Sequence, residues 1–120
     1  MKVIIAGMRD FEDYDRLVYA CDLLLKDITV TEIVSGKAPG ADTLGEDYAK
    51  ERGYKIAEFP ADWNKFKKAA GPIRNGQMAK YGDMLIAFWD RKSTGTGNMI
   101  KQAIKNDLKV SIIDITKPFV

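Results

Sequence analysis

The stretch Lys2-Val3-Ile4-Ile5-Ala6-Gly7 decides the fold class, because it is an apolar run at the start of the chain that ends in glycine. Apolar side chains on both faces of a strand are typical of a parallel sheet that helices cover on both sides. A second run of this kind, residues 84–88, predicts a central buried strand.

Helical stripes alternate with the predicted strands. Further strands are expected at 32–35, 55–59 and 109–114. The helices are expected around 17–28, 41–52, 72–81 and 99–104, with Pro72 as the first residue of its helix and residues 61–71 irregular. This alternation predicts an α/β fold, with a three-layer, doubly wound parallel sheet of about five strands in a single domain over residues 1–120.

Composition and charge exclude several classes of chemistry. The 120 residues hold 19 Lys and Arg against 17 Asp and Glu, a net charge of +2 that does not favour nucleic-acid binding by charge. The absence of histidine excludes Ser-His-Asp and Cys-His catalysis and histidine-ligated zinc. The single cysteine, Cys21, cannot form an intrachain disulfide. We expect a cytoplasmic protein without a membrane span, metal or cofactor.

The loops that follow the strands carry the candidate binding residues, because ligands of open parallel sheets bind beyond the carboxyl ends of the strands. In Gly7-Met8-Arg9-Asp10-Phe11, Arg9 offers its guanidinium to a phosphate or carboxylate, although a tight turn with a solvated arginine explains the loop equally well. In Ser35-Gly36-Lys37-Ala38-Pro39-Gly40-Ala41-Asp42, two glycines at a helix start favour a phosphate nest. Asp42 either complements the helix dipole or hydrogen-bonds to a ribose or a neighbouring loop.

Two later segments add further candidates. Residues 61–75 place Trp63 among lysines, which suits base stacking but also a core cap beside solvated lysines, and they end in Arg74 and Asn75 near a helix start. After the strand that ends at Trp89 comes Asp90-Arg91-Lys92-Ser93-Thr94-Gly95-Thr96-Gly97-Asn98. This loop is the best single phosphate site, the alternative being ordinary N-capping by Ser93 or Thr94.

Taken together, these loops resemble the YspA-like branch of the SLOG superfamily, a Rossmann-like group named after DprA/Smf and Lonely Guy proteins. The family motifs G-S-R-x-F and S-G-x-A-x-G-A-D correspond to the first two loops quoted above. The block Ala69-Ala70-Gly71-Pro72-Ile73-Arg74-Asn75 is the most specific match, and the resemblance covers about residues 1–114.

The resemblance implies a Rossmann-like domain that binds a nucleotide or a nucleotide-derived small molecule. By analogy, the pocket is formed by Gly7, Arg9, Ser35, Gly36, Gly40, Asp42, Arg74, Asn75, Gly95 and Thr96. We add Ser93 from the fourth loop, and Trp63 or Trp89 as the residue that stacks on a base. Because SLOG proteins often dimerise, a homodimer is expected.

Two departures from the family bear on activity. Met8 replaces the usual serine, and Met99 stands where Lonely Guy enzymes carry the catalytic glutamate of P-G-G-x-G-T-x-x-E. A thioether cannot act as an acid or base, so cleavage of an N-glycosidic bond would need a carboxylate from Asp42, Glu46 or Asp90.

Three hypotheses follow. The leading one is a binding protein that senses or sequesters a signalling nucleotide, with phosphate at the helix starts of the Gly36–Gly40 and Gly95–Thr96 loops. The second is a Lonely Guy type hydrolase of nucleoside monophosphates, with Asp42 and Glu46 as candidate catalytic residues. The third is binding of single-stranded nucleic acid through Lys65, Lys67 and Lys68, which the net charge of +2 disfavours.

Overall fold

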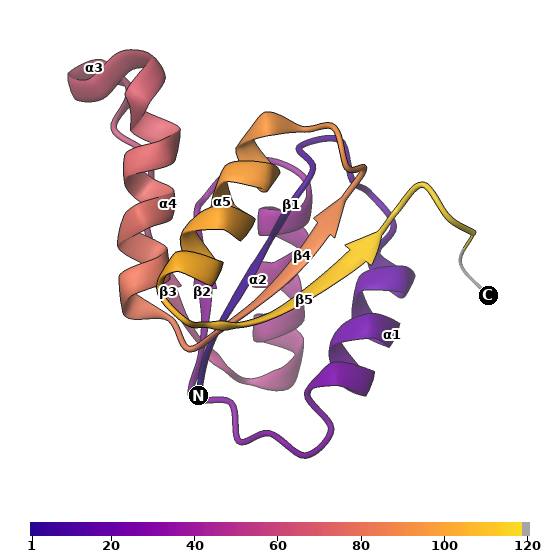
Figure 1. Ribbon diagram of the computed structural model, residues 1–120. Helices are drawn as coiled ribbons and strands as arrows, with labels where there is room; N and C mark the ends of the chain where they lie inside the picture. The colour runs from indigo at the N-terminus through magenta and orange to yellow at the C-terminus, as the bar shows by residue number, and fades with distance from the viewer. Residues whose placement is uncertain (119–120) are drawn as a thin grey trace.

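The computed structural model describes residues 1–118, which form a five-stranded parallel sheet between two layers of helices (Figure 1). Along the chain the elements are β1 (Lys2–Gly7), α1 (Tyr14–Leu24), β2 (Glu32–Ser35), α2 (Ala41–Arg52), β3 (Lys55–Glu58), α3 (Trp63–Phe66), the 3₁₀ turn η1 (Lys67–Ala69), α4 (Ala70–Tyr81), β4 (Met84–Trp89), α5 (Thr94–Lys105) and β5 (Lys109–Asp114).

The strand order is β3-β2-β1-β4-β5, and all four pairings are parallel. The chain runs outward from β1 to β3, returns to β4 on the other side of β1, and then continues to β5. The predicted three-layer, doubly wound, Rossmann-like sheet is therefore confirmed. The direction of winding reverses between β1 and β4, and the carboxyl ends of strands at such a reversal are the usual ligand site of this architecture.

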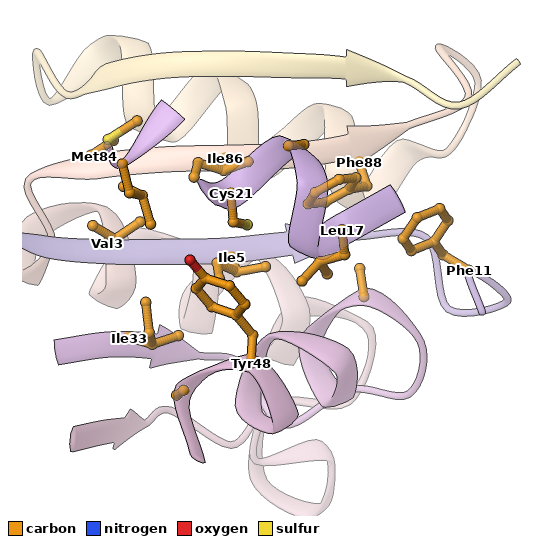
Figure 2. Close-up of a cluster of buried hydrophobic side chains, with 14 residues drawn as sticks. Val3, Ile5, Phe11, Leu17, Cys21, Ile33, Tyr48, Met84, Ile86 and Phe88 are labelled. Atoms are coloured by element: carbon orange, nitrogen blue, oxygen red, sulfur yellow. The ribbon is translucent and has the colours of Figure 1, made fainter. Parts of the chain in front are cut away.

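Two hydrophobic clusters, one on each face of the sheet, form the core. Val3 and Ile5 of β1 belong to the cluster under α1 and α2, whereas Ile4 belongs to the cluster under α4 and α5. This alternation explains why β1 reads as a continuous apolar run, since successive side chains point to opposite faces. Figure 2 shows the first cluster, in which Cys21 of α1 and Tyr48 of α2 lie over the strands.

The helix boundaries differ from expectation at several places, among them the end of α1 and the start of α4. The apolar stripe continues to Ile28, but α1 ends at Leu24, and a turn in which the Ile28 N–H donates to the Leu25 carbonyl leads the chain toward β2. Helix α4 begins at Ala70 and not at Pro72. Proline is tolerated there because the first four N–H groups of a helix have no intrahelical acceptor.

The segment expected to be irregular contains two short helical turns, α3 and η1, and projects beyond the end of α4 (Figure 1). Asp62 begins α3, because its carboxylate accepts the Lys65 N–H at 3.0 Å. The longest helices of the described chain have 12 residues, and among residues 1–118 no helix is long and apolar enough to cross a membrane.

Candidate functional site

A cavity of about 580 Å³ opens where the carboxyl ends of β1, β2 and β4 meet the helices. Its volume falls within the range of small-molecule sites. The residues that line it are Ala6, Gly7, Arg9, Ala38, Asp42, Trp63, Lys68, Gly71, Pro72, Arg74, Asn75, Met78, Ser93, Thr94, Gly95, Thr96, Asn98 and Met99. Nine of the predicted site residues are therefore brought to one cavity.

The loop between β4 and α5 is held by side chains that do not line this cavity. Asp90 accepts the N–H groups of Lys92 and Ser93, both at 2.8 Å, and the Trp89 indole N–H donates to the Ser93 carbonyl at 3.0 Å. Ser93 is the N-cap residue of α5, but its hydroxyl makes no capping hydrogen bond. The first turn of α5, which lines the cavity through Thr94, Gly95 and Thr96, thus has no side-chain cap.

Thr96, in that first turn, is a buried residue whose hydroxyl stays accessible from the cavity. The residue is only 4% exposed and lines the cavity, and no hydrogen-bond partner for its hydroxyl lies within residues 1–118. A hydroxyl in such a position is normally satisfied by protein, water or ligand. It is therefore available to a ligand at the start of α5.

Asn75 joins helix α4 to the start of α5. Its amide nitrogen donates to the Gly95 carbonyl at 3.3 Å and to the Asn98 side-chain oxygen at 3.1 Å, and its own side-chain oxygen accepts from Arg74 Nε at 2.9 Å. Both N–H groups of this amide are used within the protein. Asn75 therefore positions its neighbours.

Arg74 is only 9% exposed, and its guanidinium brings a positive charge to the cavity wall. Besides the bond to Asn75, its Nη1 donates to the Gly36 carbonyl, while Nη2 has no partner within residues 1–118. Burial lowers its pKa, and the nearby Asp42 carboxylate partly opposes this shift. An arginine stays charged despite such a shift, so its free N–H groups suit an anion.

Asp42 faces the same cavity from the first turn of α2. It is 5% exposed, and its Oδ2 accepts the Ala38 N–H at 3.3 Å. Burial raises the pKa of its carboxyl to about 6, an effect that the Ala38 hydrogen bond and the charge of Arg74 only partly offset. None of the ion pairs between residues 1 and 118 includes Asp42.

Arg9 and Trp63 form the exposed mouth of the cavity. The Arg9 guanidinium carbon lies 5.7 Å from the centroid of the indole ring, and Trp63 is 49% exposed. The loop that carries Arg9 is anchored by its backbone, since the Met8 carbonyl accepts the N–H groups of Phe11 and Ala41. An exposed indole beside a cation can accept a base or another flat ring on its free face.

Five predicted residues lie outside the cavity lining. Gly36 and Gly40 support the site from behind: a side chain at Gly36 would meet Arg74 and Asp42, and one at Gly40 would meet the backbone of Arg9. Trp89 braces the β4–α5 loop as described above. Ser35 donates its hydroxyl hydrogen to Glu46 at 2.6 Å within a buried pair.

Glu46 is occupied by partners of its own. Besides Ser35, the Lys37 ammonium contacts it at 2.9 Å. Partial burial by itself would raise the pKa of Glu46, but the hydrogen bonds from Ser35 and Lys37 hold it below the usual value. Of the two candidate catalytic carboxylates, only Asp42 is in contact with the cavity.

Sequence reasoning did not select three polar or loop residues of the lining, namely Ala38, Thr94 and Asn98, and it named Lys68 only for nucleic-acid binding. Helical spacing could have indicated Asn98, because it lies three residues after Gly95 and so on the same face of α5. No periodic signal marks Lys68, since it belongs to the short 3₁₀ turn η1.

The comparisons with known proteins give a family and one relative. The model of the "YspA, cpYpsA-related SLOG family" matches residues 1–66. The "Gene 61 protein" of Mycobacterium phage D29 is 30% identical over 116 residues, which cover 91% of this chain and 93% of the phage protein. No solved structure matches the chain. The family match spans the chain from β1 to α3 and includes the first two loops of the site. It confirms the resemblance noted in the sequence, and the chain belongs to the YspA, cpYpsA-related SLOG family.

Proposed function

We propose that this protein binds a nucleotide or nucleotide-derived ligand in the cavity, with a phosphate at the N-terminus of α5. Membership of the SLOG family suggests a nucleotide-related binding or processing role. The observation that carries the proposal is the Thr96 hydroxyl, which has no hydrogen-bond partner among residues 1–118 and lines, at a helix start, the same cavity as Arg74. Helix N–H groups, a hydroxyl and a guanidinium are the donors that phosphate prefers.

The mouth of the cavity supports a ligand larger than phosphate. Arg9 and Lys68 add exposed cations, and Trp63 offers an aromatic face for a base. The β2–α2 loop contributes less directly to anion binding, because the Ala38 N–H already donates to Asp42 and the Gly36 carbonyl already accepts from Arg74. Its role in the proposal is to hold Arg74 in place.

In this proposal the protein acts as a sensor or a sequestering protein and not as a catalyst. Met99, at the position of the Lonely Guy glutamate, is 1% exposed and lines the cavity with a thioether. Such a group can contact a ligand but cannot transfer a proton.

Isothermal titration calorimetry with the four ribonucleoside 5′-monophosphates and ADP-ribose tests the proposal. At least one of these compounds should bind. Thr96→Val should weaken that binding about tenfold, because valine has the size of threonine but lacks its hydroxyl. Thr29→Val is the matched control, since Thr29 is exposed and does not line the cavity. A folded wild-type protein that binds none of these compounds would contradict the proposal.

A second candidate function is cleavage of the bound nucleotide. One observation favours it: Asp42 contacts the cavity and has a pKa raised by burial to about 6, which suits a general acid or base. Chromatography of nucleoside monophosphates after incubation with the protein would detect the free base. Release that persists unchanged in Asp42→Asn would exclude Asp42 as the catalytic group.

A further inference from the structure

We propose that Asp42 recognises the sugar of the ligand, accepting hydrogen bonds from the ribose hydroxyls, and so selects ribonucleotides over 2′-deoxyribonucleotides. This inference rests on the proposed function, because it requires a nucleotide phosphate at the start of α5. It adds a specificity that phosphate donors alone cannot provide, since they contact only the phosphate.

Asp42 has unused hydrogen-bonding capacity in a buried place. A carboxylate can accept about four hydrogen bonds. Within residues 1–118, Asp42 accepts one, the long 3.3 Å bond from the Ala38 N–H to Oδ2, and Oδ1 accepts none. Because the side chain is 5% exposed and lines the cavity, donors for its free positions must come from whatever occupies the cavity.

The charges around Asp42 restrict the kind of donor. Arg74 of α4 and Arg9 of the β1–α1 loop are the nearby cations, and Glu46 of α2 is the nearby anion. Neither arginine is ion-paired with Asp42, so the carboxylate repels a second phosphate placed against it. A neutral group with O–H donors fits this position, and two adjacent hydroxyls match the two oxygens of a carboxylate.

The topology places Asp42 at a suitable distance from the phosphate site. It follows β2, the start of α5 follows β4, and β1 lies between these strands. Two strand spacings amount to about 10 Å, so a group bound at α5 must extend across the end of β1 to reach Asp42. Gly7, which ends β1, lines the cavity between these two positions. A sugar attached to the phosphate spans that gap, while Trp63 at the mouth is left for the base.

The test is calorimetry with adenosine, guanosine, cytidine and uridine 5′-monophosphates, each compared with its 2′-deoxy counterpart. For wild-type protein, the ribose form should bind about tenfold more tightly than the deoxyribose form, as the loss of one hydrogen bond to a charged group predicts. In Asp42→Asn this ratio should fall to within about twofold. Asp47→Asn is the matched control, because it removes the same charge from an exposed position on the same helix and should keep the wild-type ratio.

The possible outcomes separate the inference from the function on which it rests. If the monophosphates bind with equal affinity in ribose and deoxyribose forms, the inference is overturned and the proposed function stands. An Asp42→Asn effect of the same size on both sugars also overturns it, since that result would assign the carboxylate to the base. If no monophosphate binds, the inference fails, and the ADP-ribose titration decides separately whether the proposed function survives.

Discussion

At the scale of single residues, the cavity wall contains a buried carboxylate whose loss of hydration is only partly offset by contacts within the protein. Asp42 is buried with one long hydrogen bond and no ion pair among the described residues, which raises the pKa of its carboxyl from 3.8 to about 6. The Asp42 carboxylate and the Thr96 hydroxyl both keep hydrogen-bonding capacity that a ligand in the cavity can use, which favours the occupied state.

Asp42→Asn should stabilise the empty protein at pH 7.5 by about 2 kcal/mol, because it removes a buried charge while keeping the size of the side chain. The folded protein holds the Asp42 proton more tightly than the unfolded chain, so the wild-type contribution of this group improves as the pH falls from 7 toward 4. The stability gap between the variant and wild type should therefore shrink over that range. Urea unfolding at several pH values measures it, and a gap that stays constant would contradict the assignment.

Gly40 shows a second requirement at this scale, one of conformation and space. Its φ is +78°, and a Cβ there would lie 2.2 Å from the Met8 carbonyl oxygen. Gly40→Ala should therefore lower the free energy of unfolding by more than about 2 kcal/mol.

Gly53→Ala provides the comparison for Gly40→Ala. Gly53 has a similar φ of +75°, but nothing lies within 4 Å of the added Cβ. Gly53→Ala should change the free energy of unfolding by no more than about 1 kcal/mol. Denaturant unfolding of the two variants side by side measures the difference, and equal losses would show that crowding against the Arg9 loop is unimportant.

At the scale of elements, the sequence predicted most of the strands and helices, because their apolar periodicity is set by the two faces of the sheet. The strands at 32–35 and 109–114 agree with β2 and β5. The ends of helices were less predictable. The turn after Leu24 and the start of α4 at Ala70 depend on where the chain must go next, which a periodic pattern does not encode.

Gly95 in α5 gives a prediction at this scale. A Cβ added there meets nothing within 4 Å, and glycine is about 1 kcal/mol less favourable than alanine inside a helix. Gly95→Ala should raise the free energy of unfolding by up to about 1 kcal/mol and weaken nucleotide binding, because the methyl group occupies space at the phosphate site. Thermal unfolding and calorimetry measure the two effects.

Gly76→Ala is the matched control for Gly95→Ala. Gly76 lies within α4, its nearest contact with an added Cβ is at 3.9 Å, and it does not line the cavity. We expect a similar gain in stability with unchanged affinity. Equal effects of both variants on binding would mean that the start of α5 does not hold the ligand.

At the scale of the whole molecule, the site depends on contacts between segments far apart in the chain. Arg74 of α4 donates to the Gly36 carbonyl after β2, and Asn75 reaches the start of α5 after β4. The sequence indicated all of these residues as candidates, chiefly through the family motifs. It could not distinguish those that face the cavity from those, such as Ser35 and Trp89, whose polar atoms are used to hold the loops.

Arg74→Lys tests this connection. Lysine keeps the charge, but it cannot donate to Gly36 and Asn75 with the fixed fork of a guanidinium. The free energy of unfolding should fall by about 1–3 kcal/mol, and nucleotide affinity should fall about tenfold. Chemical denaturation and calorimetry measure these changes. Wild-type values for both would show that charge alone is required at this position.

Homodimer formation and a cytoplasmic location stay predictions. Light scattering tests the first of them.

The absence of a side chain at Gly36 has a consequence for how the family can diverge. A Cβ at this position would lie 2.7 Å from Arg74 Nη1 and 2.8 Å from Asp42 Oδ2. A side chain at position 36 therefore requires the side chains of Arg74 and Asp42 to shift or to be replaced. In relatives that have a smaller residue in place of the arginine or the aspartate, a larger residue than glycine should fit at position 36. Positions 36, 42 and 74 should therefore covary.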